Sequence, residues 1–261
     1  MSALLTSIDA RGVATLTLNR PERHNAFDDH LVHELTEALG RLEKLHDVRV
    51  VVLGSVGQNF SSGADLEWMR RMASFGEDDN TADAHALAQM LHMLDRLNKP
   101  TVGVVQGPAY GGGVGLLACC DTVLASDRAT FCLSEVKLGL TPATIAPYVL
   151  NAIGARQARR YFLTAEVFSA RRALEIGLVH EVVPGTTLAE EKEVLLDALM
   201  RGAPGAQAAA KSLIFHCENR AIDDDLRHET ARRIAERRRS REGQEGIAAF
   251  LNKRLPAWRE E

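Results

Sequence analysis

The sequence has little cysteine, and none of its four cysteines forms a CxxC pair. They are Cys119, Cys120, Cys132 and Cys217, and the first two lie side by side in an apolar run. Disulfide frameworks and zinc sites need several cysteines at paired spacings. The pattern therefore predicts buried thiols in a reducing compartment, and no metal site.

Long apolar runs and targeting signals are also missing. No apolar run is long enough to span a bilayer, and the start, MSALLTSIDARG, lacks a basic stretch followed by an apolar one. The 261 residues carry a net charge of -4, so neither an anionic membrane nor nucleic acid is expected as a partner. One basic run, ARRIAERRRSRE (231–242), is interrupted by acids and predicts a solvated helix face. We expect a cytoplasmic globular protein.

The fingerprints of nucleotide-binding folds are absent as well. The sequence contains no GxxxxGK[ST], and no GxGxxG opens its first crossover. This excludes the usual phosphate loop of P-loop proteins and the dinucleotide loop of Rossmann folds.

What is present is a regular alternation of strand and helix patterns. Apolar or β-branched runs predict strands over 13–21, 48–56, 100–107, 121–127 and 179–184. Helical spacing predicts helices over 28–47, with Asp28 as N-cap, and over 79–99. We therefore expect an α/β core with a mainly parallel sheet over residues 1–195. A helical C-terminal region is expected over 196–261.

Two glycine-containing turns each follow an expected buried strand and precede a helix. They are NFSSGADLEWM (59–69) and GPAYGGGVGL (107–116). A helix start leaves backbone N–H groups unpaired, and glycine lets another group approach them closely. Two such turns side by side could direct two N–H donors at one oxygen, which is the arrangement of an oxyanion hole. Each turn alone is as well explained by a simple change of chain direction.

Five segments in this order resemble the crotonase superfamily of enoyl-CoA hydratases and isomerases. They are NRPERHNAF (19–27), FSSGADLEWM (60–69), GPAYGGGVGL (107–116), FCLSEVKLGLTP (131–142) and FSARRALEIGLVHEVVP (168–184). The resemblance covers nearly the whole chain. It implies a spiral of ββα units, a coenzyme A thioester substrate, and catalysis by stabilisation of the thioester enolate. Coenzyme A would then be part of the substrate, and no separate cofactor is expected.

The resemblance assigns three catalytic positions. The amides of Ala64 and Gly112 would be the two oxyanion donors, and Glu135 would handle a substrate proton. Glu135 lies between apolar residues, and burial in an apolar cleft would raise the pKa of its carboxyl towards a useful value. The alternative for any glutamate is a surface carboxylate.

Binding of coenzyme A is assigned by the same resemblance. The backbone around Ser62, Ala64 and Leu66 would hold the adenine. The segment with Arg23 and His24 would line the pantetheine and phosphate path. A solvated turn is the alternative for that segment. Asp65 belongs to the same motif, and its alternative role is an N-cap.

Gly115 stands where many hydratases of the family have a second glutamate. Glu135 could therefore act as the only acid/base, or the enzyme could be an isomerase with one proton shuttle. A third possibility is that the glycine leaves room in the pocket for a branched acyl group.

Two segments, GGGVGLLACCD and FCLSEVKLGLTPATIAPYV, are similar to bacterial 3-methylglutaconyl-CoA hydratases of leucine breakdown. They are also similar to isohexenylglutaconyl-CoA hydratases of acyclic terpene breakdown. Both substrates are branched and carry a second carboxylate, which would want a cation nearby. The candidates are Arg70, Arg71 and Lys137. Trp68 and Tyr110 are expected to line the pocket, with packing as the alternative for Tyr110.

The C-terminal segment AFLNKRLPAW (249–258) also matches the family. Phe250 and Lys253 stand three apart, which predicts one helical face. The resemblance implies that this helix reaches a neighbouring subunit's coenzyme A site, with the aromatic near adenine and the lysine near phosphate. It implies a homotrimer, or a hexamer formed by two trimers.

Three functions are therefore open from the sequence. The first is a hydratase for branched glutaconyl-type thioesters, which also works in reverse as a dehydratase. The second is a Δ3-Δ2 enoyl-CoA isomerase that uses Glu135 alone. The third is a non-catalytic protein that binds coenzyme A or RNA, against which the presence of Glu135 and both oxyanion turns counts.

Overall fold

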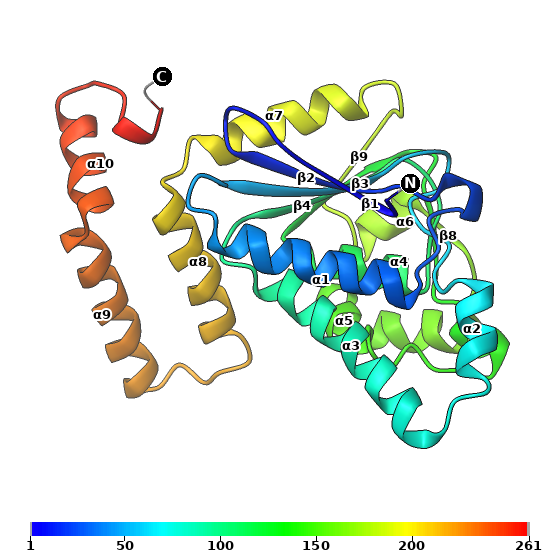
Figure 1. Ribbon diagram of the computed structural model, residues 1–261. Coiled ribbons are helices and arrows are strands. Elements are labelled where there is room, and N and C mark those ends of the chain that lie inside the picture. The colour runs from blue at the N-terminus through cyan, green and yellow to red at the C-terminus, as the bar shows by residue number, and fades with distance from the viewer. Residues whose placement is uncertain (1, 260–261) are drawn as a thin grey trace. The chain divides into compact units, whose positions relative to one another are not determined.

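The computed structural model describes residues 2–259, and the chain divides into two compact units (Figure 1). The first unit contains the residues up to Leu97 together with Thr101–Glu193. The second contains Asn98–Pro100 and the residues from Val194 onward. Every residue of the candidate catalytic site lies in the first unit.

A six-stranded sheet forms the centre of the first unit, with the strand order β1-β2-β3-β4-β6-β9. Only β1 runs antiparallel to its neighbour, and the other pairs are parallel. The expected α/β fold with a mainly parallel sheet is thus confirmed. The strands are β1 Leu4–Ile8, β2 Val13–Leu18, β3 Val50–Ser55, β4 Thr101–Val105, β6 Thr122–Ser126 and β9 Glu181–Val183.

The central strands are apolar because both of their faces are covered. The first four residues of β3 are buried, as are four of the five residues of β4. A parallel sheet flanked by helices buries both faces in this way. Helices α1 and α3 pack against each other along the unit.

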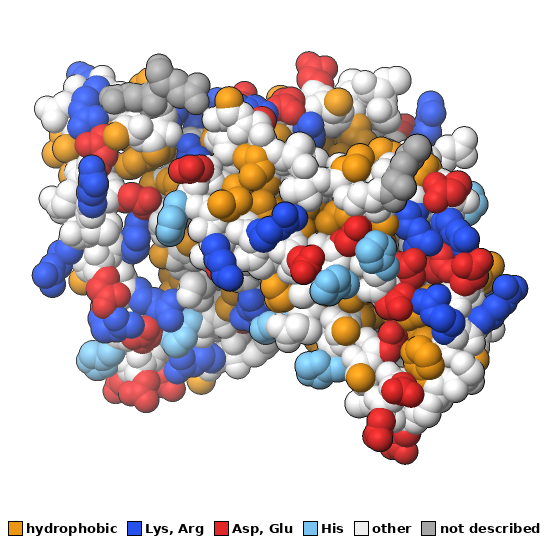
Figure 2. Space-filling model, viewed as in Figure 1, with side chains coloured by type: hydrophobic (Ala, Val, Ile, Leu, Met, Phe, Trp, Pro, Cys, Tyr) orange, Lys and Arg blue, Asp and Glu red, His pale blue; other side chains and the backbone are white. Residues whose placement is uncertain are grey.

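The helices of the first unit follow the predicted pattern. They are α1 Asp29–Lys44, α2 Leu66–Met72, α3 Glu77–Arg96, α4 Gly112–Ala118, α5 Ala146–Thr164 and α6 Ala170–Glu175. A further helix, α7 Leu188–Met200, continues into the second unit. Asp28 caps α1, as predicted, because its side chain accepts the Leu31 N–H at 2.9 Å. Acidic side chains gather at the tip where α2 is joined to α3 (Figure 2), and the first turn of α3 carries three of them.

A second, small sheet of three short strands holds the site, and the sequence did not predict it. Its strands are β5 Ala109–Tyr110, β7 Thr130–Cys132 and β8 Phe168–Ser169, in the order β5-β7-β8. The rings of Phe131 and Phe168 stack at 5.7 Å between centroids. Short 3-10 segments follow Arg20 (η1 Pro21–Arg23) and Ser134 (η2 Glu135–Leu138).

The second unit is helical. Its helices are α8 Pro204–Cys217, α9 Asp224–Arg239 and α10 Arg241–Leu251, followed by η3 Ala257–Arg259. The basic run lies largely on α9, where Glu229 accepts hydrogen bonds from Arg232 and Arg233. Intrahelical ion pairs of this kind are typical of a solvated face. No helix within residues 2–259 is long and apolar enough to cross a membrane.

One C-terminal expectation is wrong. Helix α10 ends at Leu251, and Lys253 lies beyond it with a φ of 52°. Phe250 and Lys253 therefore do not share a helical face, because the chain has already left the helix between them. Phe250 remains on the helix and is 83% exposed.

Candidate active site

The two glycine turns lie side by side. A Cβ added at Gly111 would be 3.8 Å from the Cα of Gly63, and the Tyr110 N–H donates to the Ser61 oxygen at 2.8 Å. Gly63 has a φ of +88° and Gly111 a φ of +51°, a region that L side chains rarely adopt. The glycines therefore let the two turns meet at backbone level.

Each turn leaves backbone N–H groups without an acceptor. Those of Ala64 and Gly112 are among them, and neither donates a hydrogen bond to any residue between 2 and 259. Gly112 begins α4, where unpaired N–H groups are expected. A Cβ on Gly112 would lie 2.7 Å from Cε2 of Phe27, so that ring leaves no space for a side chain at this position.

The side chain of Glu135, on η2 just after strand β7 of the small sheet, lies beside the second glycine turn. The Gly111 N–H donates to the Cys132 oxygen at 2.8 Å, which ties the second turn to the end of β7, two residues before Ser134. The Oε1 atom of Glu135 lies 3.2 Å from the position of a Cβ on Gly111. Its Oε2 atom is buried without a hydrogen-bond partner. Burial raises the pKa of this carboxyl, and its own backbone N–H lowers it by a smaller amount.

A cavity of ≈ 370 Å³ opens beside these groups. Its walls are mostly apolar, and they include Ala64, Gly112, Glu135 and Trp68. The other residues of the wall come from the segment before α1, from the two turns, from α2 and α3, and from η2 and the loops on either side of it: Phe27, Ser62, Gly63, Met69, Met72, Asp83, Ala84, Leu87, Gly111, Ser134, Leu138, Leu140, Thr141, Pro142, Ala143, Thr144 and Ile145.

The structure adds a second carboxyl to this cavity that was not predicted. Asp83 comes from α3, and its Oδ1 accepts a hydrogen bond from Nε1 of Trp68 at 3.0 Å. The sequence does contain a signal for it. Leu87, Met90 and Leu94 follow Asp83 at spacings of four, seven and eleven residues, which places the aspartate on the apolar face of α3.

Three residues expected in the pocket do not line the cavity. The hydroxyl of Tyr110 lies 3.4 Å from Oγ1 of Thr130. Lys137 is exposed on η2. Gly115 is buried inside α4, where a Cβ would lie 2.1 Å from Cγ2 of Ile145. The expectation that Gly115 leaves room for substrate is thus wrong, because the side chain of Ile145 already fills that space.

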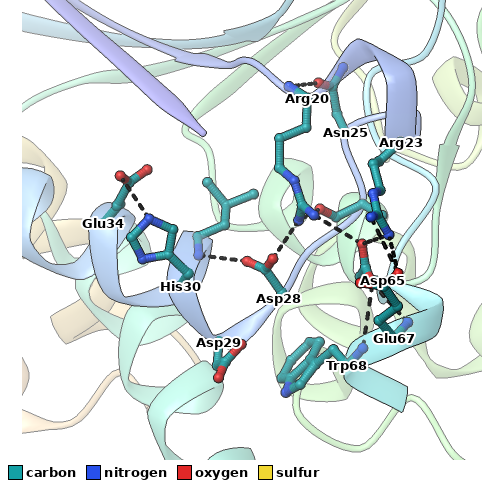
Figure 3. A network of polar contacts seen from close by, with 12 residues as sticks. Arg20, Arg23, Asn25, Asp28, Asp29, His30, Glu34, Asp65, Glu67 and Trp68 are labelled. Atoms are coloured by element: carbon teal, nitrogen blue, oxygen red, sulfur yellow. Dashed lines mark hydrogen bonds and ion pairs between the residues drawn. The ribbon is translucent and has the colours of Figure 1, made fainter. Parts of the chain in front are cut away.

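Asp65 has the structural role that was its alternative. Its side chain caps α2 by accepting the N–H of Glu67 at 2.8 Å and that of Trp68 at 3.4 Å. Figure 3 shows the carboxylate between two guanidinium groups, with Arg20 at 3.1 Å and Arg23 at 3.6 Å. Burial raises the pKa of Asp65, but these hydrogen bonds and charges lower it overall. The network holds the backbone that carries the Ala64 N–H.

We expect Asp65→Ala to lower the free energy of unfolding by about 2–3 kcal/mol, since it removes an N-cap and one of the two carboxylates that pair with Arg20. Asp65→Asn keeps the capping oxygen and should lose about half as much. The contribution of the charge is present above the ordinary pKa of 3.8 and is lost as the pH falls through the lower pKa of the folded state. Denaturant unfolding between pH 3 and pH 7 measures this. Asp78→Ala, on the exposed first turn of α3, is the control, and an equal loss there would contradict the assignment.

The other residues assigned to coenzyme A binding lie around the same turn. Ser62 lines the cavity, and its N–H donates to the His24 oxygen at 3.0 Å. His24 has a φ of 52°, and Arg23 also pairs with Glu67. Leu66 is 67% exposed at the start of α2. Their contact with coenzyme A stays a prediction. Among residues 2–259 no group of three His, Cys, Asp or Glu side chains converges that could hold a metal ion.

Comparisons with known proteins show the family of the chain. The sequence model of the enoyl-CoA hydratase/isomerase family matches residues 9–261. The crystal structure of an enoyl-CoA hydratase from Shewanella pealeana is 44% identical, with a TM-score of 0.95 over 98% of this chain and 96% of that one. Enoyl-CoA hydratase ACTT6 of Alternaria alternata is 36% identical over 92% of this chain and 78% of its own length. A 4-chlorobenzoyl coenzyme A dehalogenase of Arthrobacter is 33% identical over 86% of this chain and 82% of its own length.

Proposed function

The chain belongs to the enoyl-CoA hydratase/isomerase family, and on this premise we propose that it adds water across the double bond of an α,β-unsaturated acyl-CoA thioester. The enzyme is a lyase by the names of its hydratase relatives. The observation that carries the proposal is the meeting of three groups around Gly111. They are the N–H groups of Ala64 and Gly112, which have no acceptor, and the carboxyl of Glu135, whose Oε2 has no partner.

The two N–H groups would donate hydrogen bonds to the thioester oxygen. Addition at the β-carbon turns the thioester carbonyl into an enolate, so negative charge develops on that oxygen during the reaction. Donors that are already in place stabilise this charge more than the neutral carbonyl, and each contributes about 3 kcal/mol to the lowering of the barrier.

Glu135 would manage the proton as a single acid/base. Its carboxylate takes a proton from water as the oxygen bonds to the β-carbon. The resulting carboxylic acid then returns a proton to the α-carbon, which collapses the enolate and completes the addition of one water. Burial raises the pKa of Glu135, and this brings the two protonation states closer in energy near neutral pH.

The lining of the cavity favours an uncharged acyl group. The narrower candidates from the sequence, 3-methylglutaconyl-CoA in leucine breakdown and isohexenylglutaconyl-CoA in terpene breakdown, carry a second carboxylate. No lysine, arginine or histidine is among the described residues that line the cavity, so that carboxylate would have no cation there. We therefore propose uncharged enoyl thioesters as the preferred substrates, ahead of the glutaconyl-type thioesters.

Isomerisation of a Δ3-enoyl thioester is the competing function, because Glu135 is the one carboxyl group that the described residues place directly beside Gly111 for proton transfer. A panel of straight and branched enoyl-CoA thioesters, with and without a distal carboxylate, should be offered in ¹⁸O-labelled water. We expect one labelled hydroxyl in the product from the uncharged substrates. A product that forms without label would contradict hydration and favour the isomerase. No product from any thioester would contradict both.

The oligomer remains part of the proposal. A homotrimer or hexamer would let the exposed Phe250, on α10, meet coenzyme A bound by another subunit. Lys253 lies in the loop that follows α10, so this loop, and not the helix, would bring the lysine to a phosphate.

A further inference from the structure

The cavity that contains Glu135 also contains an acid that the proposed mechanism does not use. Asp83 projects from α3 and accepts the Trp68 Nε1 hydrogen at 3.0 Å. Trp68 is only 3% exposed and lines the same cavity, so it fixes the position of this carboxyl. The pair forms part of the wall between this cavity and a smaller pocket of ≈ 310 Å³ between α1 and α3.

Among the described residues that line the cavity, no cation neutralises Asp83. Of the three cations near the motifs, Arg70 and Lys137 are exposed, and Arg71 is bound to Asp29. Burial raises the pKa of Asp83, the Trp68 hydrogen bond and the charge of Arg71 lower it, and the charge of Asp29 raises it further. Together these effects raise the pKa of Asp83, as expected for a carboxyl group with too few favourable partners.

We infer that Asp83 determines acyl-chain specificity, selecting thioesters with an uncharged acyl group and rejecting those with a distal carboxylate. The inference rests on the proposed function only for placing the acyl group in this cavity. A second carboxylate there would face both Asp83 and Glu135 in a largely apolar space. Like charges at close range in such a space are strongly unfavourable, and a clash of this kind is how a site rejects a competing ligand.

Binding of unreactive thioesters tests this without turnover. Valeryl-CoA and glutaryl-CoA have five-carbon acyl chains, and only glutaryl-CoA ends in a carboxylate. Calorimetric titration of the full-length protein should give a Kd for valeryl-CoA at least tenfold lower than for glutaryl-CoA. Asp83→Asn should reduce that ratio at least fivefold, since the amide oxygen still accepts the Trp68 hydrogen and only the charge is lost. Asp79→Asn removes a charge one turn earlier on α3, outside the cavity, and should leave the ratio unchanged.

Equal affinity of the wild type for the two thioesters would overturn the inference, and so would a ratio that Asp83→Asn does not change. The wild-type ratio stands as a test even if the variant fails to fold. A protein that shows the expected ratios but hydrates no thioester would contradict the proposed function and support the inference. Absence of binding to both thioesters would contradict both. A hundredfold loss of kcat on an uncharged substrate in Asp83→Asn, with unchanged binding ratios, would make Asp83 a proton-transfer group instead.

Discussion

Glu135→Gln is expected to lower kcat for the hydration of an uncharged enoyl-CoA about 1,000-fold while KM changes only a few-fold. The amide has nearly the shape of the carboxyl but can neither take a proton from water nor return one to the α-carbon. The oxyanion donors and the cavity remain, so substrate binding should persist. Steady-state kinetics over a range of substrate concentrations separates kcat from KM.

Glu190→Gln is the matched control, because Glu190 is exposed on α7 and lies outside the cavity. Its kcat should equal that of the wild type. Retention of a third or more of the wild-type kcat in Glu135→Gln would refute the single acid/base mechanism.

The stability of Glu135→Gln distinguishes a lost catalytic group from a damaged fold. Burial raises the pKa of Glu135 above its ordinary value of 4.5. Below that value the carboxyl is protonated in both the folded and the unfolded chain, so it contributes no difference. As the pH rises through the higher pKa of the folded state, the wild type loses stability, because a charge forms in a buried place. The variant should therefore be at least as stable as the wild type at neutral pH, with a margin that shrinks towards pH 4.

The sequence predicted those strands whose pattern reflects burial. Strands β3 and β4 are apolar runs because they lie inside a parallel sheet, and their existence could be inferred directly. Strand β1 was missed because it lies at the edge, where only the first of its five residues is buried. Strands β5, β7 and β8 are two or three residues long, which is too short for any alternation to show.

The residues of the candidate site also fall into those that the sequence could predict and those that it could not. The turns at Gly63 and Gly111 could be predicted because their chemistry is local: a glycine backbone followed by a helix start. The apolar spacing places Asp83 on the apolar face of α3, but its position in the cavity could not be predicted, and neither could that of Ile145, since each reaches the site through packing between separate elements. Asp83 depends on how α3 lies against Trp68, and Ile145 depends on how the start of α5 lies against α4.

Gly115→Ala is expected to lower the free energy of unfolding by about 3 kcal/mol, which is roughly 6–10 °C in Tm. A Cβ at Gly115 would lie 2.1 Å from Cγ2 and 2.8 Å from Cβ of Ile145, and Ile145 is itself only 2% exposed. The two groups cannot both keep their places in a close-packed interior. Gly115→Glu should cost several kcal/mol more, because it also buries a carboxyl without a partner. Thermal and denaturant unfolding measure both variants.

Gly40→Ala supplies the matched control, since Gly40 also lies inside a helix but a Cβ there would only touch the end of Met93 at 3.5 Å. That change should stabilise the protein by about 0.5–1 kcal/mol through helix propensity. Ile145→Ala removes Cγ2, so the double variant Gly115→Ala/Ile145→Ala should be less destabilised than the sum of the single changes by more than about 1 kcal/mol. A Gly115→Ala protein as stable as the wild type would show that Ile145 does not fill this space. If the coupling is found, a second glutamate cannot be installed at Gly115 by one substitution. The single-carboxylate site is then a property of the packing between α4 and α5, and not merely of the residue at position 115.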